Sequence, residues 1–220
     1  MRKGLVIVVA VMLVLAAGCG GGSETKVPGA DQEGVVVEFE CSVLEELVRS
    51  TINKTEGDLL SEDLWELYSL RIRDEEVTSL KGLEYAKNLM DISIMYRTIP
   101  SLEPITALPE LYYLNVSYSE IGEVGTFRYP EVLTRVSFID TALADIGFME
   151  KMVNMENLTL SDTGISDITP LRDMSKLITL NLRGNNVKDI RALAGNRLWK
   201  PSRCRAIRWR ASPPWRICPV

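Results

Sequence analysis

The chain has 220 residues, no histidine and a formal net charge of −5 at neutral pH. Without histidine it lacks the commonest general base and zinc ligand, and no Gly-rich phosphate loop or CxxC pair occurs, so the sequence predicts neither an enzyme nor a metal or cofactor site. The excess of acidic residues also argues against nucleic-acid binding, which needs a positive surface.

Residues 1–18 are typical of a signal peptide. Arg2 and Lys3 precede an uninterrupted apolar run, Leu5 to Ala17, which is too short to span a bilayer comfortably. The run ends in small residues directly before Cys19, a pattern that resembles a bacterial lipobox. We therefore expect an extracytoplasmic protein anchored to the membrane by acyl chains, such as palmitate, on Cys19. The alternative is ordinary signal cleavage, with Cys19 incidental.

Residues 19–34 are rich in Gly and charge and lack apolar periodicity, which predicts a flexible tether. Residues 35–66 predict an α-rich cap that covers the end of the following domain. Within the cap, Ser42 and Glu45 fit a capping box for one helix, and Ser61 fits the N-cap of a second, short helix.

From residue 67 to 196, apolar residues recur with a spacing of 22. Counting Leu67 as position 1 of unit 1, positions 1, 4, 6, 11, 14 and 17 stay apolar through six units, the last of them incomplete. The first position reads Leu67, Leu89, Leu111, Leu133, Met155 and Leu177. This is the pattern L-x-x-L-x-L-x-x-N-x-L of a leucine-rich repeat.

The spacing predicts an α/β solenoid, the leucine-rich-repeat horseshoe. Positions 4 and 6 alternate with polar neighbours, so each unit should open with a short strand, and six stacked strands should form a parallel sheet on the concave face. The rest of each unit is too short for a long helix, so we expect single 3₁₀ or helical turns on the convex face. Pro104 and Pro170, both at position 16, fit the start of such turns.

Position 9 holds the consensus asparagine only at Asn185. Ser and Thr at this position can bond the backbone in its place, whereas Glu75 and Arg97 should make the first two corners bulge outward, because a buried unpaired charge is costly. Ser or Thr occupies the position at Ser119, Thr141 and Thr163.

The segments Gly82–Leu89 and Ile165–Leu171, with the cap residues before them, resemble internalin-like leucine-rich-repeat proteins of bacterial surfaces. The resemblance implies a surface-exposed protein that binds through its concave face and has no catalytic activity. It does not identify a ligand, because each family member recognises its partner with residues outside the consensus.

The candidate binding site is an aromatic cluster in units 2 and 3, because Tyr and Met are enriched at the cores of interfaces. We expect this cluster to bind a protein or a glycan, and we expect the chain to be a monomer. Alternatively, the tyrosines only shield the sheet from solvent. The cluster comprises Met95, Tyr96, Tyr113 and Tyr118, flanked by Arg71, Arg73, Arg135 and Ile139. Position 5 is a row of small polar residues that suits the packing of a parallel ladder: Ser93, Asn115, Ser137, Thr159 and Asn181.

Residues 197–220 leave the repeat register and hold seven basic residues and no acidic one. The break suggests an out-of-frame translation or a truncated gene; the alternative is a genuine basic tail that contacts anionic lipid or cell-wall polymer. The sequence as a whole predicts a surface lipoprotein that binds a partner. Two further interpretations stay open: a structural spacer, or the targeting arm of a longer protein.

Overall fold

The structure is a computed structural model that describes residues 34–73 and 76–196. The signal peptide, the tether with Cys19, the corner at Glu75 and the basic tail therefore lie outside the described residues. No helix within the described ranges is both long and apolar enough to cross a membrane.

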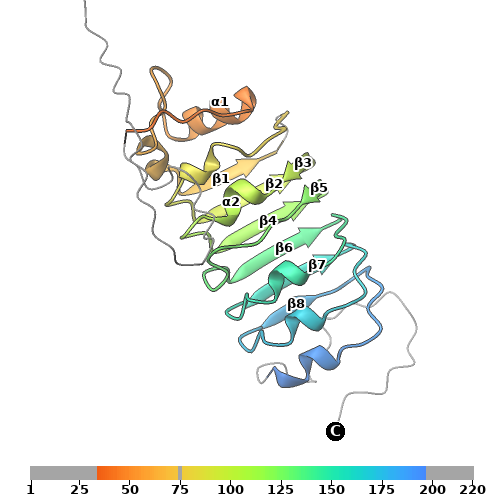
Figure 1. Cartoon of the computed structure of the whole chain (residues 1–220). Helices are drawn as coiled ribbons and strands as arrows, with labels where there is room; N and C mark the ends of the chain where they lie inside the picture. The colour runs from red at the N-terminus through yellow and green to blue at the C-terminus, as the bar shows by residue number, and fades with distance from the viewer. Residues whose placement is uncertain (1–33, 74–75, 197–220) are drawn as a thin grey trace, which may run out of the picture.

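Six parallel strands form one face of a solenoid, as the repeat spacing predicts (Figure 1). The strands are β1 (Ser69–Ile72), β2 (Asp91–Met95), β4 (Tyr113–Ser117), β6 (Arg135–Ile139), β7 (Asn157–Ser161) and β8 (Thr179–Asn181). Every pair is offset by one unit: Ser69 lies opposite Asp91, and Asp91 opposite Tyr113. Equivalent positions of successive units therefore lie side by side across the sheet.

The leucine ladder forms one continuous core behind this sheet. In β2, Ile92 and Ile94 are fully buried, whereas the alternate residues Asp91, Ser93 and Met95 are only partly covered. This alternation follows from the period of two along a strand. No single unit could bury its own apolar face, so the stack of units supplies the core.

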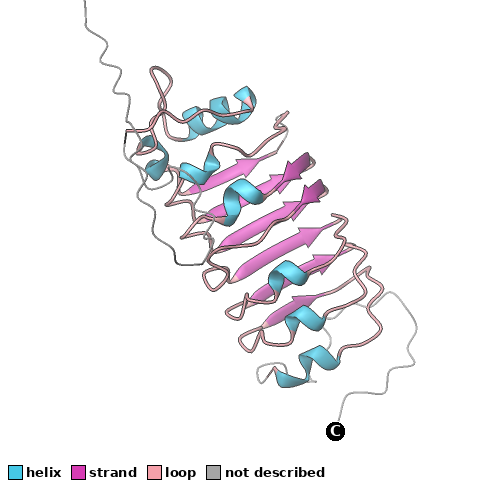
Figure 2. Ribbon diagram, viewed as in Figure 1, coloured by secondary structure: helices cyan, strands magenta, loops and turns pink. Residues whose placement is uncertain are grey.

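Single helical turns line the opposite face, also as expected (Figure 2). They are η2 (Leu83–Tyr85), α2 (Glu103–Thr106), η3 (Gly147–Met149), η4 (Thr169–Leu171) and η5 (Arg191–Gly195). Pro104 and Pro170 stand in the first turn of α2 and η4. In the later units a position-13 aspartate bonds the first residue of the turn: the Oδ1 atoms of Asp145 and Asp189 accept the N–H groups of Gly147 and Arg191, at 2.7 and 2.9 Å.

A second, two-stranded parallel sheet was not predicted: β3 (Thr98–Ser101) pairs with β5 (Glu120–Glu123) after the corners of units 2 and 3. Its formation depends on a close main-chain approach. A Cβ atom at Gly122 would overlap the carbonyl oxygen of Pro100, so only glycine fits there. The repeat pattern predicts that the side chains of Ile99 and Ile121 face the core, but it does not predict that β3 and β5 pair.

Ser119 and Thr141 bond the backbone at buried corners in place of the consensus asparagine, as predicted, whereas the Thr163 hydroxyl donates to the Asn185 side chain at 2.9 Å. The hydroxyl group of Ser119 donates to the carbonyl oxygen of Ser117 at 2.8 Å, and that of Thr141 donates to Ile139 at 3.1 Å. The predicted outward bulge at Arg97 is wrong. The Arg97 main chain stays within the ladder, because its N–H donates to the Ser119 Oγ atom at 3.2 Å and its carbonyl accepts the Glu120 N–H at 2.8 Å.

The cap contains α1 (Ser42–Thr51) and η1 (Asp63–Glu66), and its residues Leu44 and Val48 extend the core. The predicted capping box is wrong, because Cys41 is the N-cap and Ser42 is already helical. Glu45 instead pairs with Arg49 one turn later, at 2.9 Å.

The second predicted cap is also wrong. Glu62, not Ser61, is the N-cap of η1, and neither helix of the cap has a side-chain capping hydrogen bond.

Candidate binding surface

The concave face is polar, and two pairs of its side chains form hydrogen bonds across neighbouring strands. Ser69 donates to the Asp91 carboxylate at 2.7 Å, and Thr179 donates to the Asn157 amide oxygen at 2.7 Å. These partners are 22 residues apart, so the bonds link equivalent positions of adjacent units. All four residues stand at position 3 of their units, and side chains that satisfy each other offer fewer groups to a ligand.

Two tyrosines stand out at the edge where β2 and β4 end. Tyr96 follows β2 and Tyr118 follows β4, one unit apart. Their rings stack with centroids 5.1 Å apart and planes 9° from parallel. They are 57% and 47% exposed, so their contact with each other leaves most of the outward ring surface in solvent.

Both tyrosines have a left-handed backbone. Position 8 has a positive φ in each of units 2 to 6: 59° at Tyr96, 53° at Tyr118, 50° at Asp140, 55° at Asp162 and 73° at Gly184. Here the chain turns back from the sheet while its N–H groups continue the ladder; Tyr118, for example, donates to the Ile139 carbonyl at 2.7 Å. Gly and Asp accommodate this conformation, but it costs a bulky residue roughly 1–2 kcal/mol.

The register separates the predicted aromatic cluster into two parts. Met95, Tyr96, Tyr118 and Ile139 lie together at the carboxyl ends of the strands. Tyr113 lies at the opposite end of β4.

The predicted flanking arginines are separated in the same way. Arg135 lies beside Tyr113. Arg71 lies opposite Ser93, on the edge strand β1, and Arg73 is exposed just beyond the end of β1.

A second group of exposed side chains was not predicted. Tyr68, Met90 and Tyr112, all at position 2, are 49%, 41% and 38% exposed just before β1, β2 and β4. The signal was present in the sequence, because three consecutive units carry a large apolar side chain at a position outside the consensus. Sequence reasoning missed it since only positions inside the expected strands were considered.

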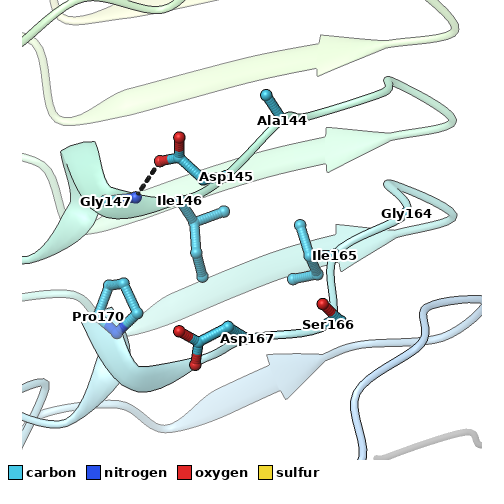
Figure 3. A pocket seen from close by; sticks show the side chains of 9 residues that line it. All are labelled: Ala144, Asp145, Ile146, Gly147, Gly164, Ile165, Ser166, Asp167 and Pro170. Carbon is cyan, nitrogen blue, oxygen red and sulfur yellow. Dashed lines mark hydrogen bonds between the residues drawn. The ribbon is translucent and has the colours of Figure 1, made fainter.

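A cavity of about 270 Å³ lies between the convex turns of units 4 and 5 (Figure 3). The two carboxylates that line the cavity accept hydrogen bonds from residues of their own turns. Asp145 accepts the Gly147 N–H, and Asp167 accepts both the hydroxyl group (2.6 Å) and the N–H (2.8 Å) of Thr169. The bond from the Thr169 hydroxyl, followed by that from its N–H, lowers the pKa of Asp167. In the described part of the chain no three potential metal ligands gather.

A family model for two copies of the leucine-rich repeat matches residues 153–195. An internalin (inlF) from Listeria monocytogenes has a similar structure, with a TM-score of 0.55 and 21% identity over 74% of this chain and 55% of that one. The fold is that of the internalin leucine-rich repeats. The functional domain of InlJ from the same species matches with a TM-score of 0.50 and 18% identity, over 74% of this chain and 40% of that one.

This internalin-like chain thus spans about half the length of the first of these neighbours and less of the second. No curated protein sequence matches it.

Proposed function

We propose that this chain is a bacterial cell-surface lipoprotein whose internalin-like repeats bind a protein or glycan partner. The binding centre is the tyrosine edge, the surface formed by Met95, Tyr96, Tyr118 and Ile139. The observation that carries the proposal is the stacked, exposed pair Tyr96–Tyr118 in a left-handed backbone.

The left-handed backbone is unfavourable for tyrosine, which supports a role for Tyr96 and Tyr118 other than stabilising the fold. The same corner is built with Asp140, Asp162 and Gly184 in the later units, so the fold does not need an aromatic residue there. Strained residues that persist at exposed positions are concentrated at functional sites. Large aromatic side chains are also the commonest energetic centres of protein interfaces.

The remaining predicted residues form the surroundings of this centre. Arg73 is exposed on the side of unit 1, and Arg71 lies on the concave face. Tyr113 and Arg135 lie at the far end of the strands, so a partner must cross the polar face to reach them.

The anchor at Cys19 and the monomeric state belong to the same proposal. A lipid at the start of the tether would hold the repeats on the outer side of the membrane. The resemblance to surface-exposed internalins fits this location.

The test applies the full-length protein in detergent to an array of extracellular proteins and glycans. The variant Y96N/Y118N keeps a residue type that tolerates the left-handed backbone but removes both rings. We expect it to lose at least tenfold in affinity for the partner of the wild-type chain. The control Y68N/Y112N removes two exposed rings from the opposite edge and should retain binding; equal binding by wild type and Y96N/Y118N would refute the proposal.

The spacer interpretation is the second candidate, favoured by the hydrogen bonds that engage the concave face within itself. A spacer would tolerate substitution of both edges without any loss of a partner. In the targeting-arm interpretation a separate module of a longer protein carries the function. That interpretation therefore also predicts that Y96N/Y118N has no effect on binding.

A further inference from the structure

We propose that the partner is a protein segment that places an arginine or lysine side chain on the outer ring face of Tyr118, beside Asp140. This inference rests on the proposed function and specifies its chemistry: the ligand is basic peptide, not glycan. Nothing in the leucine-rich-repeat pattern requires such a site.

The stack leaves one face of Tyr118 uncovered by its neighbour. Because the two rings are within 9° of parallel, Tyr96 covers one face of the Tyr118 ring. The other face is directed along the solenoid toward unit 4, since β6 follows β4 in the sheet. The electron-rich face of a tyrosine ring attracts cations, and the planar guanidinium of arginine stacks on it.

The residue that follows in this direction is acidic. Asp140 occupies position 8 of unit 4, one strand spacing, or roughly 4.8 Å, beyond Tyr118. It is exposed, and within the described residues it belongs to none of the ion pairs. A cation on the Tyr118 ring would therefore have a carboxylate within reach.

Asp162, the next residue of the row, is one unit further from Tyr118. A Cβ atom at Gly184 would overlap the Asp162 carboxylate, so this side chain lies over the following unit. Asp140 is therefore the carboxylate of the row that lies nearest to the Tyr118 ring.

Charge on the two sides of the stack differs in sign. Arg73 and Arg97 lie on the side of units 1 and 2, whereas exposed Glu120 joins Asp140 on the side of Tyr118. An anionic ligand would be repelled from the Tyr118 side, and a neutral sugar could donate hydrogen bonds to the carboxylates but could not form an ion pair with them. A basic side chain combines the cation–π contact with the ion pair.

The experiment uses an array of dodecapeptides, each paired with a copy in which citrulline replaces arginine. Citrulline keeps the shape of the side chain but removes its charge. Full-length protein in detergent is applied as wild type, Y118N, D140N and the control D173N, which removes an exposed acid from the convex side. Asparagine suits the left-handed backbone at residues 118 and 140, so these variants should fold.

We expect the bound peptides to contain arginine and to bind about fivefold more strongly than their citrulline copies, in line with the usual energies of a cation–π contact and an exposed ion pair. Y118N should abolish this preference, D140N should lower it about threefold, and D173N should leave it unchanged. Equal losses in D140N and D173N would overturn the proposal, because they would indicate a general field effect of the acidic chain.

Two further outcomes separate this inference from the proposed function. If Y96N/Y118N loses a partner but citrulline copies bind as well as their arginine originals, or only glycans bind, the basic-ligand inference is overturned and the proposed function stands. If Y96N/Y118N binds every ligand of the wild-type protein, both fail together.

Discussion

Asn185 accepts two hydrogen bonds from Thr163, which stands one unit earlier: its Oδ1 atom lies 3.0 Å from the Thr163 backbone nitrogen and 2.9 Å from the Thr163 hydroxyl oxygen. The Nδ2 atom of Asn185 donates to the carbonyl oxygens of Leu160 and, at 3.1 Å, Leu182. A single side chain therefore joins the corners of units 5 and 6.

Replacement of Asn185 by alanine should lower the free energy of unfolding by about 2–3 kcal/mol, because it leaves the buried Thr163 donors and the Leu160 and Leu182 carbonyls without their partner. Urea denaturation monitored by circular dichroism measures the change. The control N186A alters an exposed neighbour with no side-chain hydrogen bond in the described structure. Equal stability of N185A and N186A would show that the corner bonds are dispensable.

The spacing of 22 was sufficient to predict the sheet, its register and the single turns, because a repeat fixes which residues are equivalent and stacking then places equivalent residues side by side. It could not predict the pairing of β3 with β5, which depends on a close main-chain contact at Gly122. The capping motifs at Ser42 and Ser61 also misplaced the starts of α1 and η1, whose N-cap residues, Cys41 and Glu62, make no side-chain capping hydrogen bond.

The candidate site was predicted only in part. Neighbouring units in the sequence correctly suggested that Tyr96 and Tyr118 meet. The position within each unit was neglected for Tyr113 and Arg135, so their separation from the pair was missed. The left-handed backbone at position 8 was also not predicted, although Asp140, Asp162 and Gly184 in the later units are residue types that favour it.

The variant Y96N/Y118N should be about as stable as the wild-type chain. Loss of the stack costs roughly 0.5–1.5 kcal/mol. Asparagine adopts the left-handed conformation at a lower cost than tyrosine, so partial relief at the two residues offsets this loss. Thermal or urea unfolding measures the balance. A loss of more than about 3 kcal/mol would mean that the pair serves the fold, and the reason for assigning it to binding would disappear.

Gly122→Ala should destabilise the chain by about 1–3 kcal/mol, because the added methyl group overlaps the Pro100 carbonyl oxygen and forces β3 and β5 apart. Gly164→Ala is the comparison, since a Cβ atom there meets nothing within 4 Å and only the positive φ of 81° opposes it. Urea denaturation measures the loss of stability in both variants, and amide hydrogen exchange should show altered protection in residues 98–123 only for Gly122→Ala. Unchanged protection there would argue against the second sheet.

Lipid attachment at Cys19 predicts that cells fed labelled palmitate incorporate the label into the wild-type protein and not into the C19S variant. Because acyl chains supply the anchor, C19S should also leave the membrane fraction. The buried Cys41 provides the matched control, and C41S should keep the label. Labelling of C19S equal to wild type, or none in either, would exclude this anchor.

The carboxyl group of Asp189 should titrate with a pKa well below the ordinary range of aspartate. The hydrogen bonds from the Arg191 guanidinium, and then from its backbone N–H, lower the pKa of Asp189 from 3.8 to about 2. Since the folded value is the lower one, the contribution of this carboxylate to stability is complete above the ordinary pKa and is lost as the pH falls through about 2. Carboxyl-carbon NMR should show the low midpoint in wild type and a shift toward the ordinary value in R191A. An Asp189 midpoint that R191A leaves unchanged would rule out the guanidinium as the cause.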